Sequence, residues 1–306
     1  MSHPPGLPGR EWRGVIVATS LPFARTSAGE LEPDLVAYAE SVAWLADQGL
    51  HGVAPNGSLG EYQTLETSAR DAVVRTAVEH ATEGFVVMPG VGAYSGRESR
   101  RHAEVARDLG CQAVMALPPN AYRGDERAVL EHYELVAAAG LPVVAYNNPV
   151  DTKIDLTAPM LARLHREGLI VAVKEFTGDP RRAYEIAELA PGLDVLIGSD
   201  DTVLEVALAG GVGWVSGYAQ VFPRACLRLF EAAVAGDLDT ALPLYRTLHP
   251  LLRWDSRTEF VQAIKLGQDL VGRSGGVCRP PRQPLDEQTL GVVRAATLAV
   301  IDAGLC

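Results

Sequence analysis

The chain has 306 residues, 47% hydrophobic and 21% charged, with a formal net charge of -11. Its length allows one large domain with a substantial core. The acidic balance argues against a nucleic-acid-binding groove, which needs a basic face. No apolar stretch reaches the roughly 18 residues of a membrane span.

Short apolar runs recur along the chain and lack period-two alternation, which is typical of parallel strands buried on both faces. A helix-like pattern follows each run. Eight such alternating units favour a (β/α)8 TIM barrel over an open, doubly wound sheet. The segment after the first strand, Thr19-Ser20-Leu21-Pro22-Phe23, is no glycine-rich phosphate loop. The expected strands are residues 14–18, 52–55, 85–88, 113–117, 143–146, 170–174, 195–197 and 212–215.

The helix-like segments carry recognisable end signals. Pro33 suits the first position of the first helix, and a glycine follows several helices as a C′ cap would. These glycines are Gly49, Gly110, Gly140 and Gly236. The expected helices are residues 33–48, 68–80, 96–109, 126–139, 157–166, 180–189, 202–209 and 223–235.

These patterns divide the chain into three parts. Residues 1–12 read as a flexible N-terminal tail without the apolar run of a secretory signal. Residues 13–236 form the expected barrel, and residues 237–306 form a C-terminal helical appendage packed on it. The run Arg279-Pro280-Pro281-Arg282 interrupts this appendage before a last helix near residues 286–303.

The cysteines show neither a C-x-x-C pair nor metal-ligand spacing. We therefore expect reduced thiols in a cytoplasmic protein and no metal site. The four cysteines are Cys111, Cys226, Cys278 and Cys306.

Lys174 is the sharpest chemical signal. Barrel enzymes carry their chemistry at the C-terminal ends of the strands, and Lys174 ends an apolar strand. Desolvation would lower its pKa and leave a neutral amine, which attacks a carbonyl carbon. The alternative is a lysine paired with Glu175 at the barrel rim.

Other strand ends hold further candidate residues. Tyr146 ends the neighbouring strand and offers a phenol for proton relay, unless it is only a core tyrosine. The turn of Gly57, Ser58 and Leu59 offers backbone amides and a hydroxyl to a carboxylate, unless it is an ordinary turn. Gly198 and Ser216 end the last two strands and are further candidate substrate-binding residues.

Three motifs in order resemble the dihydrodipicolinate synthase / N-acetylneuraminate lyase family: Gly-Ser-x-Gly-Glu, Tyr-Asn-x-Pro and Val-Lys-Glu-x-Thr-Gly. The resemblance runs from Gly14 to about Ile301. It implies a class I lyase in which Lys174 forms a Schiff base and Tyr146 relays protons. It also implies that Ser58 and the Leu59 amide hold the substrate carboxylate.

The same resemblance bears on partners and on a second tyrosine. It implies a small 2-oxo or imino acid substrate, no cofactor, and a homo-oligomer, either a dimer or a homotetramer. The family often has a tyrosine after the fourth strand. The nearest one here, Tyr122, is out of register with that position.

Two departures argue against lysine-pathway synthase activity. Asp151 stands where the synthases have a carboxylate-binding arginine. Leu59 replaces the second residue of their Thr-Thr pair, whose hydroxyl helps connect the tyrosine relay.

Two other groups of the family look closer. The runs Asn147-Asn148-Pro149-Val150, Val212-Gly213-Trp214-Val215-Ser216-Gly217 and Arg279-Pro280-Pro281-Arg282 resemble 1-pyrroline-4-hydroxy-2-carboxylate deaminases. The runs Gly57-Ser58-Leu59-Gly60-Glu61 and Gly275-Gly276-Val277-Cys278-Arg279 resemble 4-hydroxy-2-oxoglutarate aldolase.

The charge of Asp151 separates these two substrates. It would repel a second carboxylate and favour an ammonium, so the deaminase interpretation leads. Arg123 or Arg253 is the alternative source of a cation for the dicarboxylate of the aldolase. A hypothesis of another class is a barrel that binds a 2-oxo acid without turnover. Borohydride trapping with pyruvate separates a reactive lysine from mere binding.

Overall fold

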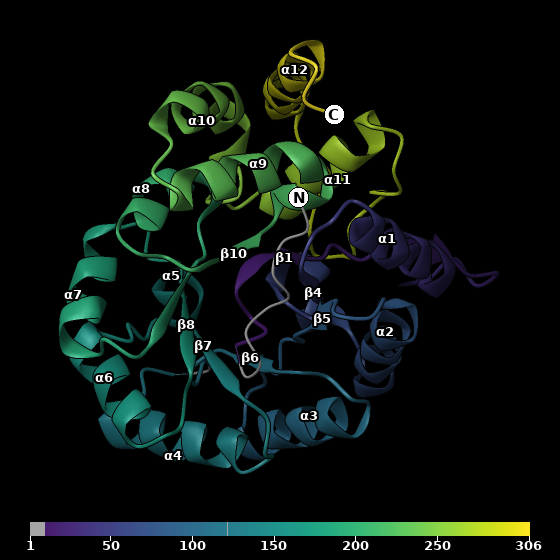
Figure 1. Cartoon of the computed structure of the whole chain (residues 1–306). Helices are drawn as coiled ribbons and strands as arrows, with labels where there is room; N and C mark the ends of the chain where they lie inside the picture. The colour runs from purple at the N-terminus through teal and green to yellow at the C-terminus, as the bar shows by residue number, and fades with distance from the viewer. Residues whose placement is uncertain (1–9, 121) are drawn as a thin grey trace.

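The structure is a computed structural model that describes residues 10–120 and 122–306. Its centre is a sheet of eight parallel strands with the order β5-β4-β1-β10-β9-β8-β7-β6. Figure 1 shows these strands enclosed by a ring of helices. The strands are β1 (Gly14–Ala18), β4 (Gly52–Ala54), β5 (Val86–Val87), β6 (Val114–Ala116), β7 (Val143–Asn147), β8 (Ala172–Glu175), β9 (Asp194–Ile197) and β10 (Gly213–Ser216).

The sheet closes on itself between β5 and β6. Gly90 and Met115 form a parallel bridge there. The Met115 amide donates to the Pro89 carbonyl, and the Val91 amide donates to the Met115 carbonyl, each at 2.9 Å. The predicted (β/α)8 barrel with additional C-terminal helices is therefore confirmed. All the predicted strands are present. Each is buried both on its inner face and under the helices, which is why it appears in the sequence as a short apolar run.

The helices around the barrel begin and end close to the predicted positions. The predicted glycine caps are confirmed, since Gly49, Gly110, Gly140 and Gly236 all have positive φ angles. The helices are α1 (Leu35–Asp47), α2 (Thr67–His80), α3 (Gly96–Asp108), α4 (Glu126–Ala137), α6 (Ala158–Arg166), α7 (Arg181–Leu189), α8 (Val203–Leu208) and α9 (Pro223–Val234).

The start of the first helix differs from the prediction. Asp34 is the N-cap of α1 and accepts a hydrogen bond from the Ala37 amide at 3.0 Å. Pro33 belongs instead to a short antiparallel hairpin of β2 (Phe23–Arg25) and β3 (Leu31–Pro33), which the sequence analysis did not predict. The helix begins after Asp34 because the aspartate side chain satisfies a backbone amide of the first turn that would otherwise have no partner.

The N-terminal segment is bound where the structure begins to describe it. The Trp12 indole donates to the Asp194 carboxylate at 2.9 Å, and Arg10 and Arg13 form ion pairs with the same carboxylate. Asp194 is the first residue of β9. Residues 10–12 are thus held on the barrel, so the prediction of a flexible tail is wrong for them; residues 1–9 of the predicted tail lie outside the described residues.

Three further helices pack beside the barrel next to α9 and α1 (Figure 1). They are α10 (Leu238–Leu252), α11 (Phe260–Leu270) and α12 (Glu287–Asp302). Helix α10 packs on α9, and α11 contacts the 3-10 turn η1 (Ser58–Gly60) after β4. No helix in the described ranges is long and apolar enough to cross a membrane.

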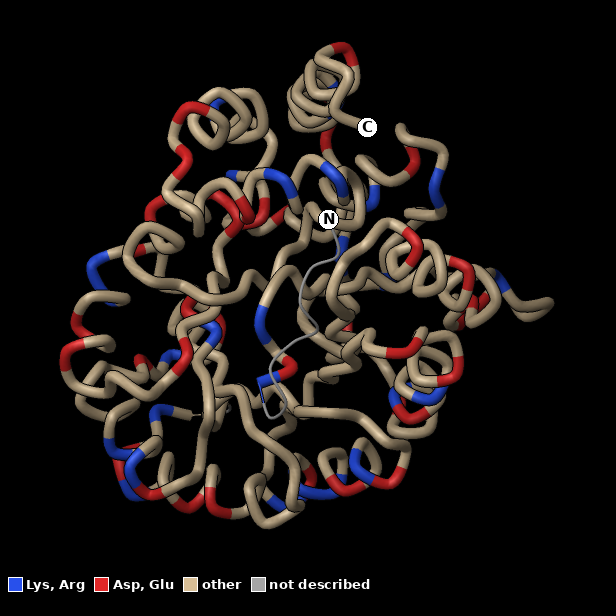
Figure 2. Tube along the Cα trace, viewed as in Figure 1, with Lys and Arg blue, Asp and Glu red and all other residues tan. Residues whose placement is uncertain are grey.

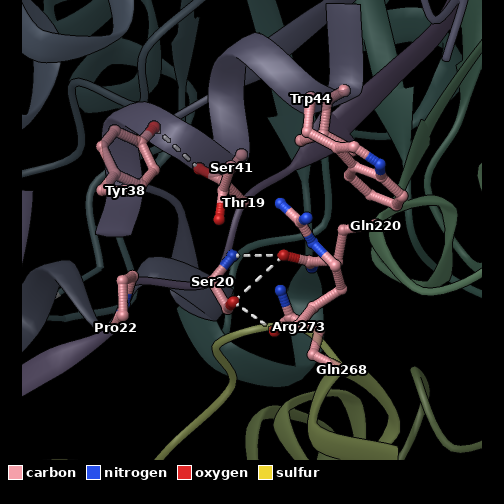
Figure 3. Close-up of a pocket in the computed structure, with 10 residues that line it drawn as sticks. Thr19, Ser20, Pro22, Tyr38, Ser41, Trp44, Gln220, Gln268 and Arg273 are labelled. Carbon is pink, nitrogen blue, oxygen red and sulfur yellow. Dashed lines mark hydrogen bonds between the residues drawn. The ribbon is translucent and has the colours of Figure 1, made fainter. Parts of the chain in front are cut away.

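A small cavity marks one junction between the barrel and these helices (Figure 3). Its volume is about 10 Å³, which is space for about one water molecule. The Ser20 hydroxyl donates to Gln268 of α11 at 2.7 Å, and Gln220 accepts from the Ser20 amide at 3.0 Å. Arg273 covers the Trp44 ring at 4.2 Å. These contacts fix α11 against the end of β1.

A buried ion pair forms a second junction. Lys265 of α11 lies 2.7 Å from Glu61, and both side chains are almost completely buried. The second Glu61 oxygen accepts from the Arg279 amide at 2.9 Å. Glu61 has a left-handed backbone (φ 53) directly after η1. The ion pair therefore holds both the turn after β4 and the C-terminal segment.

We expect Lys265→Met to lower the free energy of unfolding by about 3–5 kcal/mol, because it leaves the buried Glu61 carboxylate without its counter-ion. Urea unfolding followed by circular dichroism measures this. Lys153→Met removes an exposed lysine and is the matched control. The pair Glu61→Leu with Lys265→Met should recover part of the loss. A Lys265→Met variant as stable as wild type would contradict this account of the ion pair.

Charged residues otherwise follow the outside of the molecule. Figure 2 shows Lys, Arg, Asp and Glu mainly along the outer helices and loops. The charged side chains buried in the interior are therefore exceptions that need an explanation, because a buried charge is costly unless it is paired. Besides the pair above, they include Lys174, Glu175, Asp200 and Asp255.

Candidate active site

Lys174 lies near the C-terminal end of β8, between Tyr146 of β7 and Leu196 of β9. It is only 5% exposed. Its Nζ atom lies 4.2 Å from the centroid of the Tyr146 ring and 5.7 Å from that of Phe176. Burial lowers the pKa of Lys174, although the charges of nearby aspartates oppose this. A lowered pKa increases the fraction of neutral, nucleophilic amine.

Glu175 does not pair with Lys174. Successive side chains of a strand point to opposite faces, so the two residues face different sides. The Glu175 carboxylate accepts hydrogen bonds from the Asn147 side chain at 3.0 Å and from the Thr177 amide at 2.8 Å. The alternative interpretation, in which Lys174 pairs with Glu175 at the barrel rim, is therefore wrong.

Lys174 opens into a cavity of about 260 Å³ at the C-terminal end of the barrel. This volume suits a small metabolite better than a drug-sized ligand. Most of the residues predicted from the sequence meet in its wall: Gly57, Ser58, Leu59, Tyr146, Asp151 and Lys174.

Tyr146 is buried beside Lys174. The Asn148 side-chain amide donates to the Tyr146 hydroxyl at 3.3 Å and to the Asp151 carboxylate at 2.9 Å. Burial, and then the charges of Asp255 and Asp151, raise the pKa of Tyr146 well above its usual value. The phenol therefore stays protonated. Since its oxygen already accepts from Asn148, its own proton is available to a ligand.

The turn after β4 places Gly57, Ser58 and Leu59 in the wall of this cavity. Gly57 precedes the 3-10 turn, and the first amides of such a turn have no partner within it. The Ser58 hydroxyl lies at the same place. Met115 also lines the cavity here, so an apolar side chain faces these donors.

Asp151 lies at the mouth of the cavity. It belongs to the short helix α5 (Pro149–Thr152), which begins directly after β7. Asn148 caps this helix, because its side-chain oxygen accepts from the Asp151 amide at 3.2 Å. Asn148 thus fixes the position of the Asp151 carboxylate relative to the Tyr146 phenol.

Comparison with known proteins agrees with this geometry. The family model described as the dihydrodipicolinate synthetase family matches residues 11–299. A 4-hydroxy-tetrahydrodipicolinate synthase of Methanospirillum hungatei JF-1 is 31% identical over 280 residues, covering 91% of this chain and 96% of the relative. The same-named protein of Anaeromyxobacter sp. (strain K) is 34% identical over 270 residues, covering 86% of this chain and 90% of the relative.

Solved structures give the same answer. A putative dihydrodipicolinate synthetase from Pseudomonas aeruginosa superposes with a TM-score of 0.88 at 33% identity, covering 94% of this chain and 99% of the other. This chain belongs to the dihydrodipicolinate synthetase family. It is accordingly an enzyme of the class I aldolase type.

The structure of this dihydrodipicolinate synthetase family member keeps three of the predicted residues out of the cavity wall. The Gly198 amide donates to the Glu175 carbonyl, and a Cβ at Gly198 would lie 2.4 Å from that oxygen, so its smallness serves strand packing. The Ser216 hydroxyl donates to Asp200 at 3.1 Å. Tyr122 is 56% exposed.

The cavity wall also contains residues that the sequence analysis missed. Asp255, Arg257 and Arg282 come from the segments between the C-terminal helices. Neither Arg123 nor Arg253, the cations considered from the sequence, lines the cavity. Asp255 lies two residues beyond Arg253, the C-cap of α10, so neither a strand end nor a helical pattern pointed to it.

Proposed function

We propose that this enzyme is a Schiff-base lyase for a small 2-oxo or cyclic 2-imino acid, with Lys174 as the nucleophile. The observation that carries this proposal is a buried lysine with a lowered pKa that opens into a cavity of metabolite size. A neutral amine in such a site adds to the electrophilic C2 of a 2-oxo acid and forms an imine.

Tyr146 and the turn after β4 complete the proposed machinery. The imine makes the protons on C3 acidic. The Tyr146 phenol, whose ring centroid lies 4.2 Å from the Lys174 Nζ atom, relays protons here: it gives its own proton to the leaving group while its oxygen accepts the proton from C3. The Ser58 hydroxyl and the amides of Ser58 and Leu59 hold the substrate carboxylate. We do not assign Gly198, Ser216 or Tyr122 a contact with substrate inside one chain.

Borohydride trapping tests the proposal. Each substrate of a panel (pyruvate, 4-hydroxy-2-oxoglutarate and the hydroxypyrroline carboxylate) is mixed with the enzyme and reduced. The chain has three lysines, Lys153, Lys174 and Lys265, so peptide mass mapping separates them. We expect the adduct on Lys174. An adduct on another lysine, or none with any substrate, rejects the proposal.

Our best candidate for the reaction is that of a 1-pyrroline-4-hydroxy-2-carboxylate deaminase. Lys174 adds to the ring C=N at C2, and the ring opens to a free amine on a lysine-bound imine. Loss of a C3 proton then expels the 4-hydroxyl as water and leaves a C3=C4 double bond, which shifts so that the terminal amine becomes an imine. Hydrolysis of this imine releases ammonia, and hydrolysis of the imine at C2 frees Lys174 and gives a 2-oxo acid with a terminal aldehyde. Asp151, fixed at the cavity mouth by Asn148, attracts the developing ammonium.

The second candidate is an aldolase for 4-hydroxy-2-oxoglutarate, which carries a second carboxylate. Arg257 and Arg282 in the cavity wall favour it. Arg282 is positioned by the Thr258 carbonyl at 3.3 Å and covers the Phe260 ring at 5.1 Å. We place synthase activity behind both, although the relatives named above are synthases. Asp151 and Leu59 depart from the synthase pattern.

We expect Asp151→Asn to change the ratio of kcat/KM values for the pyrroline and the dicarboxylate by at least about tenfold, in favour of the dicarboxylate. Two unit charges about 4 Å apart interact by roughly 4 kcal/mol at an effective dielectric of about 20, so screened charges still reach a factor of ten. Asp155→Asn, in the same loop but outside the cavity wall, is the control. If wild type prefers the dicarboxylate, or if the ratio is unchanged, the aldolase replaces the deaminase.

We also propose a homo-oligomer, a dimer or a tetramer, from membership of the family. A solved relative at 24% identity is described as a monomeric variant, so assembly is not uniform among proteins with this fold. Light scattering of the purified chain measures its state.

A further inference from the structure

Asp255 reaches the lysine cavity from outside the barrel. It lies in the segment between α10 and α11, yet it is only 8% exposed and lines the same cavity as Lys174. One of its oxygens, Oδ2, accepts from the Asp200 amide at 3.3 Å. The other, Oδ1, would lie 2.7 Å from a Cβ at Gly217. The carboxyl group is therefore pressed against the end of β10, where only glycine leaves room for it.

The neighbouring Asp200 accepts more hydrogen bonds than Asp255 does. It accepts hydrogen bonds from the Trp214 indole and the Tyr218 amide, each at 2.8 Å, and from Ser216. These donors stabilise its ionised form. Among the hydrogen bonds of the described residues, the Asp255 carboxyl group accepts one, which the Asp200 amide donates.

The pKa values of both carboxyl groups are raised, and that of Asp200 is about 6. Burial, and then the charge of Asp200, raise the pKa of Asp255 well above its usual value. When two carboxylates share a buried site, the one with fewer donors takes the proton. The raised pKa of Asp255 favours its protonated form, in the same cavity where the lowered pKa of Lys174 favours the neutral amine. Among the nearby aspartates, its charge would raise the pKa of Lys174 most.

We infer that Asp255 is a second proton-transfer residue of this enzyme, the acid that lets the first adduct on Lys174 expel its leaving group. The inference rests on the proposed function of Lys174. It assigns the proton transfer of imine formation to Asp255 and the proton transfers at C3 to Tyr146.

The step balances with the groups in the cavity. Lys174 adds to C2 of the 2-oxo acid and gives a carbinolamine with a neutral nitrogen and a hydroxyl on C2. Asp255 gives its proton to this hydroxyl, the C–O bond breaks, and water leaves with the bonding electrons. The nitrogen lone pair forms the C=N bond. The products are a protonated imine, water and the Asp255 carboxylate, which then faces the new positive charge.

The same proton serves a cyclic imino acid. Addition of Lys174 to the ring C=N gives a carbon that carries two nitrogens. Protonation of the ring nitrogen by Asp255 lets the C2–N bond break and releases the amine. Hydrolysis at the end of the cycle reverses the first step, because the Asp255 carboxylate removes a proton from the attacking water.

The rate of imine formation tests the inference. Asp255→Asn keeps the shape and the acceptor for the Asp200 amide but removes the acidic proton. Wild type and variant are mixed with pyruvate and quenched with borohydride at increasing times, and the adduct on Lys174 is quantified by mass. We expect the rate constant to fall by roughly 10²–10⁴-fold, the range of positioned acid–base catalysis. Asp239→Asn changes an exposed aspartate in the first turn of α10 outside the cavity wall; it is the control and should stay near wild type.

Chemical rescue separates a proton donor from a packing residue. Asp255→Ala leaves space for a small carboxylic acid, and added formate should accelerate its imine formation. A wild-type rate in Asp255→Asn, or an Asp255→Ala rate that formate does not change, overturns the inference and leaves Lys174 as the nucleophile. Absence of any adduct in wild type rejects the proposed function itself.

Discussion

A Lys174→Ala variant is expected to lose turnover completely and to form no borohydride adduct, while it folds as wild type does. No other lysine can take over as the nucleophile, because Lys174 is the lysine that lines the cavity. Of the other two lysines, Lys265 is committed to Glu61, and Lys153 is exposed beside α5. Burial already lowers the pKa of Lys174, and its amine is not the sole partner of any one carboxylate. We therefore expect the fold to persist when this amine is removed.

The measurements are kcat with the best substrate of the panel, adduct mass and the thermal unfolding curve. Lys153→Ala is the matched control, and it should trap substrate at the wild-type rate. Residual turnover of Lys174→Ala above that of a heat-denatured sample would show that the reaction does not pass through this lysine.

Tyr146→Phe is expected to lower kcat by roughly 10²–10⁴-fold, the usual range for a positioned acid or base. The substitution keeps the ring, which contacts Phe176 edge to face at 6.1 Å, and removes only the hydroxyl. Asn148 keeps its second acceptor, Asp151, so the local structure should persist. The variant should still form an imine with pyruvate, because imine formation is assigned to Asp255.

Steady-state assay with the best substrate, combined with the trapping time course, checks this division of labour. Tyr184→Phe changes an exposed tyrosine on α7 and is the control. Activity of Tyr146→Phe within a factor of a few of wild type would make Tyr146 a packing residue.

Much of the barrel was predictable because its strands are short apolar runs buried on both faces. The meeting of Tyr146 and Lys174 was predictable for the same reason, since both end neighbouring strands and parallel strands bring their ends to one edge. The turn at Ser58 followed from the same rule. These predictions depend only on backbone topology and on where polar residues follow an apolar strand.

Asp255 and Arg282 were beyond this rule because neither follows a barrel strand. They reach the cavity only through the packing of α10, α11 and the segment before α12, which a periodic pattern does not place in space. The β2–β3 hairpin was missed because its strands have three residues each and are largely exposed. The requirement for glycine at Gly198 was visible only as a close approach to the Glu175 carbonyl.

The buried pair of Glu61 and Lys265 ties together two parts of the enzyme that can change independently. Lys174 and Tyr146 stand on barrel strands, whereas Asp255, Arg257 and Arg282 stand on segments that several contacts hold at the barrel mouth, this ion pair and the Arg279 amide among them. Substitutions in those segments can alter which molecule enters without disturbing the lysine. Overall similarity along the barrel is therefore a guide to the type of bond chemistry, whereas a comparison of substrates must also include the C-terminal segments that complete the cavity wall.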